Sequence, residues 1–166
     1  MAVPWLACMI AVAQYYHLPP RVLPSIHAVE GGAPGTVSRN TNGTQDLGVM
    51  QVNTTWVPHL SGIARMRPDA VRARLIDDPC FNIAAAGVIM RTYLNEARGD
   101  VVRAVGYYHS HTPEYAIPYQ YKVIDAAAGL FGGPRPMRHT RAAMTVRDRM
   151  RLARANAMRE HGRRGG

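Results

Sequence analysis

The sequence predicts a mainly helical domain that carries one small two-stranded β-ribbon. Three observations support this fold class. Apolar residues recur at helical spacing through most of the segment from residue 6 to residue 130. Capping residues such as Asn53 and Asp100 precede several of these runs, and prolines or glycines follow them. The strongest hairpin signal is Asn42-Gly43, a pair typical of a two-residue β-turn.

The first two expected helices cover residues 6–16 and 21–29. Pro19-Pro20 ends the first, because a residue before proline is biased away from helical geometry. Pro24 falls in the first turn of the second, where its missing N–H group does no harm. Gly31-Gly32 ends that helix.

The following segment is rich in Gly, Pro, Asn, Thr and Ser and predicts a loop that contains the ribbon. We expect residues 37–39 to pair with residues 45–48 across the turn at Asn42-Gly43. Asn53 then caps a helix whose apolar residues, Trp56 and Leu60, face inward.

Four more helices are expected, at residues 68–76, 80–97, 101–109 and 115–130. The longest, 80–97, is the candidate for the central helix, and acidic residues lie at its N-terminus, where the helix dipole favours them. The small residues 84–87 would let another helix approach it closely. Asp100 caps the next helix, and Gly132-Gly133-Pro134 ends the last one.

Length and charge predict one compact domain at residues 1–133, followed by a basic, arginine-rich tail at residues 134–166. The formal net charge is +9, and Lys122 is the only lysine. Such a balance suggests polyanionic surroundings, whether nucleic acid, anionic lipid or an acidic wall polymer. No apolar run reaches the roughly 20 residues of a membrane-spanning helix, so we expect a soluble protein without a transmembrane segment. Residues 141–161 of the tail have the composition of an amphipathic helix.

The two cysteines, Cys8 and Cys80, have no spacing typical of a metal site. They are either two buried thiols or one long-range disulfide formed in an oxidising compartment.

Glu30 is the candidate catalytic residue, because it stands at the end of the second helix, directly before two glycines. Burial against Ile26, Val29 and Met50 would raise the pKa of its carboxyl group, and a general acid needs such a raised pKa near neutral pH. The alternative interpretation is an ordinary solvated glutamate in the last turn of a helix.

Five separated segments resemble the soluble lytic transglycosylase family, in particular its secretion- and conjugation-associated branch. The resemblance covers about Cys8 to Leu130, and the order and spacing of the segments make it specific. It implies the fold of goose-type lysozyme. The segments are His27-Ala28-Val29-Glu30-Gly31, Ser38-Arg39-Asn40, Asp46-Leu47-Gly48-Val49-Met50-Gln51-Val52-Asn53, Asp78-Pro79-Cys80-Phe81-Asn82-Ile83 and Ala104-Val105-Gly106-Tyr107-Tyr108-His109-Ser110.

The resemblance implies cleavage of the bond between N-acetylmuramic acid and N-acetylglucosamine in peptidoglycan, without water, which leaves a 1,6-anhydromuramoyl end. Glu30 matches the single catalytic carboxylate, and the substrate's own N-acetyl group replaces the second carboxylate that most glycosidases use. Members of this branch commonly have a disulfide that involves an N-terminal cysteine, so the resemblance also implies a bridge between Cys8 and Cys80. The implied setting is the periplasm, where the protein would open the wall for a secretion or conjugation apparatus. We expect an exported protein whose signal, if it had one, does not form part of this sequence.

The resemblance also assigns substrate-binding residues. Gln51 and Tyr108 match positions that line the cleft, and an amide and a phenol can both hydrogen-bond a sugar. Ser38 matches a hydroxyl near the acid, Met50 matches a cleft-wall residue beneath the sugar, and a Cβ atom at Gly48 would crowd the backbone against the substrate. The alternative for each of these residues is ordinary packing.

This chain departs from the family pattern at two places. Gly31 stands where a serine commonly follows the acid, and Tyr108-His109-Ser110-His111 replaces a Tyr-Asn-Ala-Gly run. His109 and His111 are poorly placed to bind one metal ion, because residues i and i+2 of a helix point apart, and we expect neither a metal nor a cofactor. Asp46 is the nearest second carboxylate, and hydrogen bonding to backbone N–H groups in a turn is its expected role.

Three alternative functions remain at this point. One is a muramidase that uses water on the same bond, and a second is an inactive wall-binding subunit of an assembly. The third is a nucleic-acid-binding protein, which the arginine-rich tail suggests. No recognised nucleic-acid-binding motif is present, and the aromatic residues cluster in the predicted domain, so we expect no specific nucleic-acid partner. The expected partners are a peptidoglycan strand and components of a secretion or conjugation machine.

Overall fold

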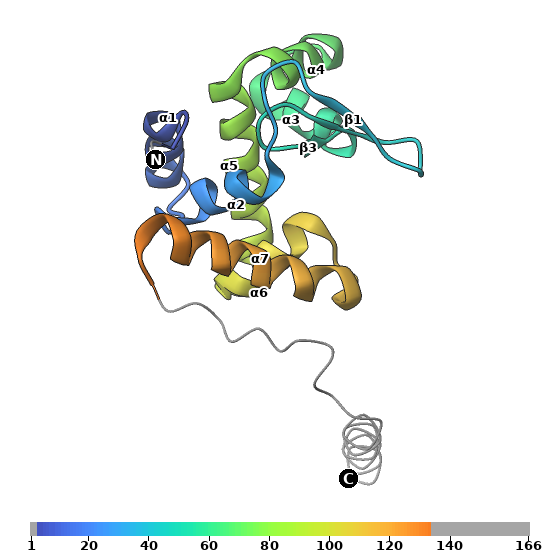
Figure 1. Cartoon of the computed structure of the whole chain (residues 1–166). Helices are drawn as coiled ribbons and strands as arrows, with labels where there is room; N and C mark the ends of the chain where they lie inside the picture. Colours follow the sequence, from blue (N-terminus) through green and yellow to red (C-terminus); the bar gives the residue numbers. More distant parts are fainter. Residues whose placement is uncertain (1–2, 134–166) are drawn as a thin grey trace, which may run out of the picture. The chain divides into compact units, whose positions relative to one another are not determined.

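The structure is a computed structural model of the chain, and it describes residues 3–133 (Figure 1). The described part is mainly helical with a small antiparallel sheet, which confirms the predicted fold class. The predicted tail and its helix at 141–161 lie outside the described residues. The elements are α1 (Leu6–Tyr15), α2 (Val22–Glu30), β1 (Val37–Arg39), β2 (Gln45–Leu47), β3 (Val52–Asn53), the 3-10 turn η1 (Thr54–Trp56), α3 (Val57–Ala64), α4 (Pro68–Asp77), α5 (Pro79–Glu96), α6 (Val101–His109) and α7 (Pro113–Phe131).

The sheet has three strands in the order β1-β2-β3, one more than the predicted two-stranded ribbon. The expected pairing of β1 with β2 is present, with Ser38 opposite Asp46. The third strand forms because the chain reverses between Gly48, at φ +65°, and Gln51, at φ +50°. The Gln51 N–H group bonds the Gly48 carbonyl oxygen at 3.2 Å, and the returning chain pairs Asn53 with Asp46.

Helix α5 is the central helix, as the sequence predicted. It contacts α1, α4 and α6, and Figure 1 shows it running through the middle of the described residues. The close approach expected at its small residues occurs at Gly87. A Cβ atom there would lie 2.3 Å from Val12 Cγ1 and 2.8 Å from Tyr16 Cδ2, both on the α1 side.

A disulfide joins Cys8 in α1 to Cys80 in the first turn of α5, with the two Cα atoms 5.5 Å apart. The bridge resolves the choice that the sequence left open. It spans 72 residues of chain, and a loop of that length lowers the entropy of the unfolded state by an amount worth about 4 kcal/mol in the chain-entropy model. Within residues 3–133, no helix is long and apolar enough to cross a membrane.

A buried amide on α5 fixes the loop between β2 and β3. Asn82 is fully buried, and its Oδ1 atom accepts a hydrogen bond from the Met50 N–H group at 2.9 Å. Its Nδ2 atom donates to the carbonyl oxygens of Leu47 and Leu75, each at 2.7 Å. One side chain therefore connects α5, the β2–β3 turn and the end of α4.

Replacing Asn82 with alanine should lower the free energy of unfolding by roughly 3 kcal/mol or more, since three buried backbone groups would lose their partner. Urea denaturation of the oxidised chain measures this change. The control is Asn95→Ala on the same helix, which is exposed and should stay within about 0.5 kcal/mol of the parent. If Asn82→Ala does not fold, Asn82→Asp keeps the acceptor for Met50 but turns a buried carboxylate oxygen toward the Leu47 and Leu75 carbonyl oxygens, so at neutral pH it should also be less stable than the parent. Equal stability of the parent and either variant would contradict this role.

Candidate active site

Glu30 is the last residue of α2, where the sequence placed it. The helix stops because Gly31 adopts φ +63°, and its N–H group bonds the His27 carbonyl oxygen at 2.9 Å. The next residue, Gly32, passes directly over the β2–β3 turn: a Cβ atom there would lie 2.2 Å from the Gly48 carbonyl oxygen. Gly31 therefore ends the helix, and Gly32 allows the close approach to the turn, which the sequence analysis did not predict.

The Glu30 carboxylate accepts a hydrogen bond from the Tyr119 hydroxyl group, with 2.5 Å between the two oxygens. Tyr119 belongs to α7 and is only 4% exposed. Burial, together with the neighbouring carboxylate, raises the pKa of Tyr119 far above its ordinary value, so the phenol remains a donor. Sequence reasoning missed this residue, because 89 positions separate it from Glu30 and nothing distinguished it among the aromatic residues of α7.

Burial raises the pKa of Glu30, in the direction predicted from the sequence. The hydrogen bond from Tyr119 acts in the opposite direction, the negative charge of Asp46 raises the pKa further, and the positive charge of Lys122 lowers it. Burial is the largest of these effects. Glu30 therefore keeps its proton to a higher pH than an exposed glutamate, as a general acid requires.

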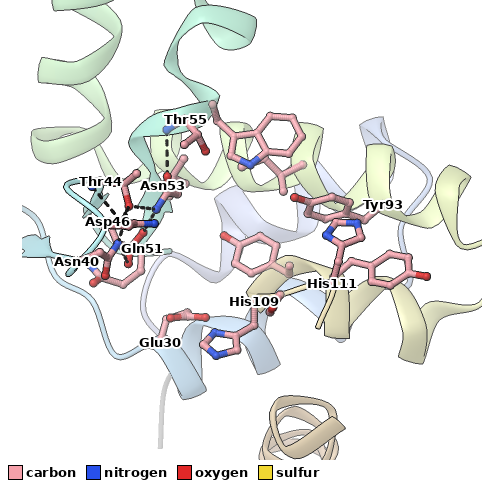
Figure 2. A pocket seen from close by; sticks show the side chains of 17 residues that line it. Glu30, Asn40, Thr44, Asp46, Gln51, Asn53, Thr55, Tyr93, His109 and His111 are labelled. Atoms are coloured by element: carbon pink, nitrogen blue, oxygen red, sulfur yellow. Dashed lines mark hydrogen bonds between the residues drawn. The ribbon is translucent and has the colours of Figure 1, made fainter. Parts of the chain in front are cut away.

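Glu30 opens into a pocket of about 430 Å³ (Figure 2). Figure 2 shows Glu30 and His109 along one side, Asp46 with its amide neighbours at one end, and Tyr93 with His111 at the other. Two further predicted site residues, Gln51 and Tyr108, line the same pocket. The lining residues are Glu30, Asn40, Asn42, Thr44, Asp46, Gln51, Val52, Asn53, Thr55, Trp56, Ile89, Tyr93, Tyr107, Tyr108, His109, Ser110 and His111.

Gln51 is held by two hydrogen bonds. Its Oε1 atom accepts from the Ser38 hydroxyl group at 2.7 Å, and its Nε2 atom donates to the Gly48 carbonyl oxygen at 2.8 Å. Its backbone lies in the left-handed region, which is costly for a residue with a side chain. Ser38 does not itself line the pocket. Its hydrogen bond orients the amide of Gln51.

The structure places Met50 and Gly48 in the turn between β2 and β3, next to the core. The Met50 side chain is fully buried in the core and is not among the residues that line the pocket. Its carbonyl oxygen accepts a hydrogen bond from the Tyr108 hydroxyl group at 2.9 Å. A Cβ atom at Gly48 would lie 2.1 Å from the Leu75 carbonyl oxygen and 2.5 Å from Asn82 Nδ2. Packing inside the protein therefore requires a glycine at this position.

Tyr108 connects α6 to the β2–β3 turn through this bond to Met50. Burial, followed by the negative charges of Glu30 and Asp46, raises the pKa of Tyr108 well above its ordinary value. The phenol therefore stays neutral and keeps donating to Met50, which leaves its oxygen as an acceptor for other groups.

Asp46 is the second carboxylate of the pocket. Its two oxygens accept hydrogen bonds from the side-chain amides of Asn53, at 2.7 Å, and Asn40, at 2.9 Å. The expectation that Asp46 would bond backbone N–H groups of a turn is wrong in detail, because side-chain amides take that place.

The residues at which this chain departs from the family pattern also lie at or next to this site. His109 lines the pocket and stacks on Tyr119, with ring centroids 4.7 Å apart and planes at 4°. Burial and the charge of Lys122 lower the pKa of His109, while Asp46 acts in the opposite direction. Gly31 is exposed, with open space where a side chain would begin. Among residues 3–133, no group of three or more His, Cys, Asp or Glu side chains is arranged to hold a metal ion.

Comparison with known proteins gives the class of this chain. The sequence profile of the family described as "Transglycosylase SLT domain" matches residues 7–114. The chain belongs to this family. It is 26% identical over 109 residues to the "Invasion protein IagB" of Salmonella typhimurium strain SL1344, and equally so to those of Salmonella typhimurium strain LT2 and Salmonella typhi. The aligned part is 65% of this chain and spans 64% of the length of these relatives.

Replacing Tyr119 with phenylalanine should raise the pKa of Glu30 further, because the hydrogen bond that favours the ionised form would be lost while burial remains. Carbon-13 NMR titration of the glutamate carboxyl groups measures this pKa without any substrate. Tyr121→Phe, an exposed tyrosine on the same helix, is the matched control and should leave the titration unchanged. A lowered pKa of Glu30 in Tyr119→Phe would show that the bond does not act on the carboxylate as described.

Proposed function

We propose that this protein is a peptidoglycan lytic transglycosylase with Glu30 as its catalytic acid and base. The proposal rests chiefly on one observation: the partly buried carboxyl group of Glu30, whose pKa is raised, opens into a pocket that Gln51 and Tyr108 also line. Membership of the transglycosylase SLT domain family supports the reaction class.

In the first step Glu30 gives its proton to the glycosidic oxygen, and the bond between that oxygen and C1 of the N-acetylmuramic acid residue breaks. The carbonyl oxygen of the substrate's N-acetyl group bonds to C1 and stabilises the positive charge there. In the second step the C6 hydroxyl oxygen attacks C1, the bond from the acetyl oxygen breaks, and the hydroxyl proton returns to Glu30. No water is consumed, and the product ends in a 1,6-anhydro ring.

The surrounding side chains support these two steps. Tyr119 keeps the carboxyl group in one orientation and can donate to whichever oxygen carries the negative charge between the steps. Gln51, oriented by Ser38, and Tyr108, anchored on Met50, offer fixed hydrogen-bonding groups to the sugar.

We further propose that the enzyme acts in the periplasm and opens the wall locally for a secretion or conjugation apparatus. The disulfide between Cys8 and Cys80 supports an oxidising compartment. The role at such an apparatus rests on the resemblance to the secretion- and conjugation-associated branch, and the Salmonella relatives carry the name invasion protein.

Replacing Glu30 with glutamine should lower the rate of wall cleavage by roughly 10² to 10⁴-fold, since the amide has no proton to transfer. Mass spectrometry of the products released from purified sacculi measures both the rate and the chemistry, and the parent should release anhydro-terminated muropeptides. Glu114→Gln, an exposed carboxylate in the first turn of α7, is the control and should match the parent. A parent chain that binds sacculi and releases nothing would instead support an inactive wall-binding subunit.

Hydrolysis by a muramidase is the second candidate, and Asp46 is the observation that favours it. The carboxylate lines the same pocket as Glu30 and acts on its pKa. In a two-carboxylate glycosidase the second carboxylate serves as nucleophile or base, and the product has a free reducing end. The amide contacts of Asp46 favour instead a supporting role for the β-sheet wall.

Replacing Asp46 with asparagine distinguishes the two reactions. If Asp46 only supports the pocket wall, Asp46→Asn should lower the rate of cleavage by less than about tenfold, and the products should keep their anhydro ends. The alkaline limb of the pH profile should move to lower pH, because the negative charge that raises the pKa of Glu30 is gone. A loss of roughly 10³-fold, with reducing-end products from the parent, would establish hydrolysis.

A further inference from the structure

The pocket has two chemically different ends. Amide, hydroxyl and carboxylate groups line the end formed by the sheet, around Asp46. The opposite end carries a group of rings that none of the catalytic steps uses. We call this group the aromatic platform and define it as Trp56, Tyr93, Tyr107 and His111, all of which line the pocket.

The rings of the platform are fixed against one another. Tyr107 and His111 are stacked, with centroids 4.3 Å apart and planes at 14°. Tyr93 meets His111 edge-on at 5.3 Å and Tyr107 at 6.2 Å. Trp56 meets Tyr93 edge-on at 5.6 Å, which extends the arrangement from η1 across α5 to α6 and the turn that follows it.

His111 is the most open member of the platform. Its Nε2 atom lies 2.9 Å from the Glu96 carboxylate, which fixes the direction of the ring, while 51% of the histidine side chain stays exposed. Tyr107 covers one face of the imidazole, so the exposed surface belongs largely to the remaining face and edge. His111 also stands where the run that this chain resembles has a glycine, so the ring is an addition by this chain.

We propose that the aromatic platform binds a pyranose ring of the glycan strand by stacking, at a subsite beyond the one where Glu30 acts. This inference rests on the proposed function and names a specific contact for its substrate. The equatorial substituents of N-acetylglucosamine leave C–H groups on both faces of the ring. Those faces pack on flat aromatic surfaces, whose negative ring faces attract C–H edges. The phenol hydroxyl groups and the imidazole at the rim can bond the sugar's equatorial oxygens.

Isothermal titration calorimetry with chitohexaose tests this proposal in the full chain carrying Glu30→Gln, so that turnover does not interfere. Adding His111→Ala, or separately Tyr107→Leu, should weaken chitohexaose binding about tenfold, the loss expected for one aromatic contact. The matched control is His59→Ala. His59 meets Trp56 edge-on at 5.7 Å but does not line the pocket, so its removal should leave the affinity unchanged. Thermal melting of each variant reports folding separately.

The outcomes separate this inference from the proposed function. Affinity that is equal in the Glu30→Gln chain and in the same chain with His111→Ala or Tyr107→Leu added overturns the platform and leaves the proposed function intact. Equal loss in His59→Ala also overturns it, because the effect would then come from packing around Trp56. No binding of chitohexaose by the Glu30→Gln chain overturns the platform as a saccharide site, while the products that the parent releases from sacculi decide the proposed function independently.

Discussion

The site geometry depends on the buried amide of Asn82. Its three hydrogen bonds hold the β2–β3 turn against α5 and the end of α4, and Gly48 lies so close to this amide that no side chain fits between them. Gly32 packs closely on the same turn, at Gly48 and Val49, which places the end of α2. The orientation of Gln51 and the position of Glu30 therefore follow from one set of contacts inside the protein. A buried polar group whose hydrogen bonds are all made fixes the positions of its partners. A partner that moved away would lose its hydrogen bond, and no water could reach it to replace the bond.

Two opposing influences set the properties of the acid. Burial favours the protonated form of Glu30, whereas the phenol of Tyr119 stabilises the ionised form. A residue that must release a proton and take it back within one cycle needs both forms to be accessible, and these two influences supply them. His109, which replaces an amide of the resembled run, stacks on the ring of Tyr119 and keeps the phenol in position.

Local sequence signals predicted those features that depend on neighbours along the chain. The end of α2 at Glu30, the turn at Asn42-Gly43 and the caps at Asn53 and Asp100 belong to this group. Features set by contacts between distant segments escaped prediction. The third strand needs the backbone reversal at Gln51, and the burial of Met50 and the partner of Glu30 depend on how α6 and α7 pack.

Helix α7 has a further consequence for how the limits of this domain are drawn. The family match ends at residue 114, one residue after α7 begins, yet α7 packs against both α2 and α6 and carries the hydroxyl group that faces Glu30. A fragment cut at the limit of the match would retain the acid and every matched residue while exposing the acid to solvent. For this chain, the smallest fragment that keeps Glu30 shielded from solvent includes all of α7, which lies almost entirely beyond the region that the family match identifies.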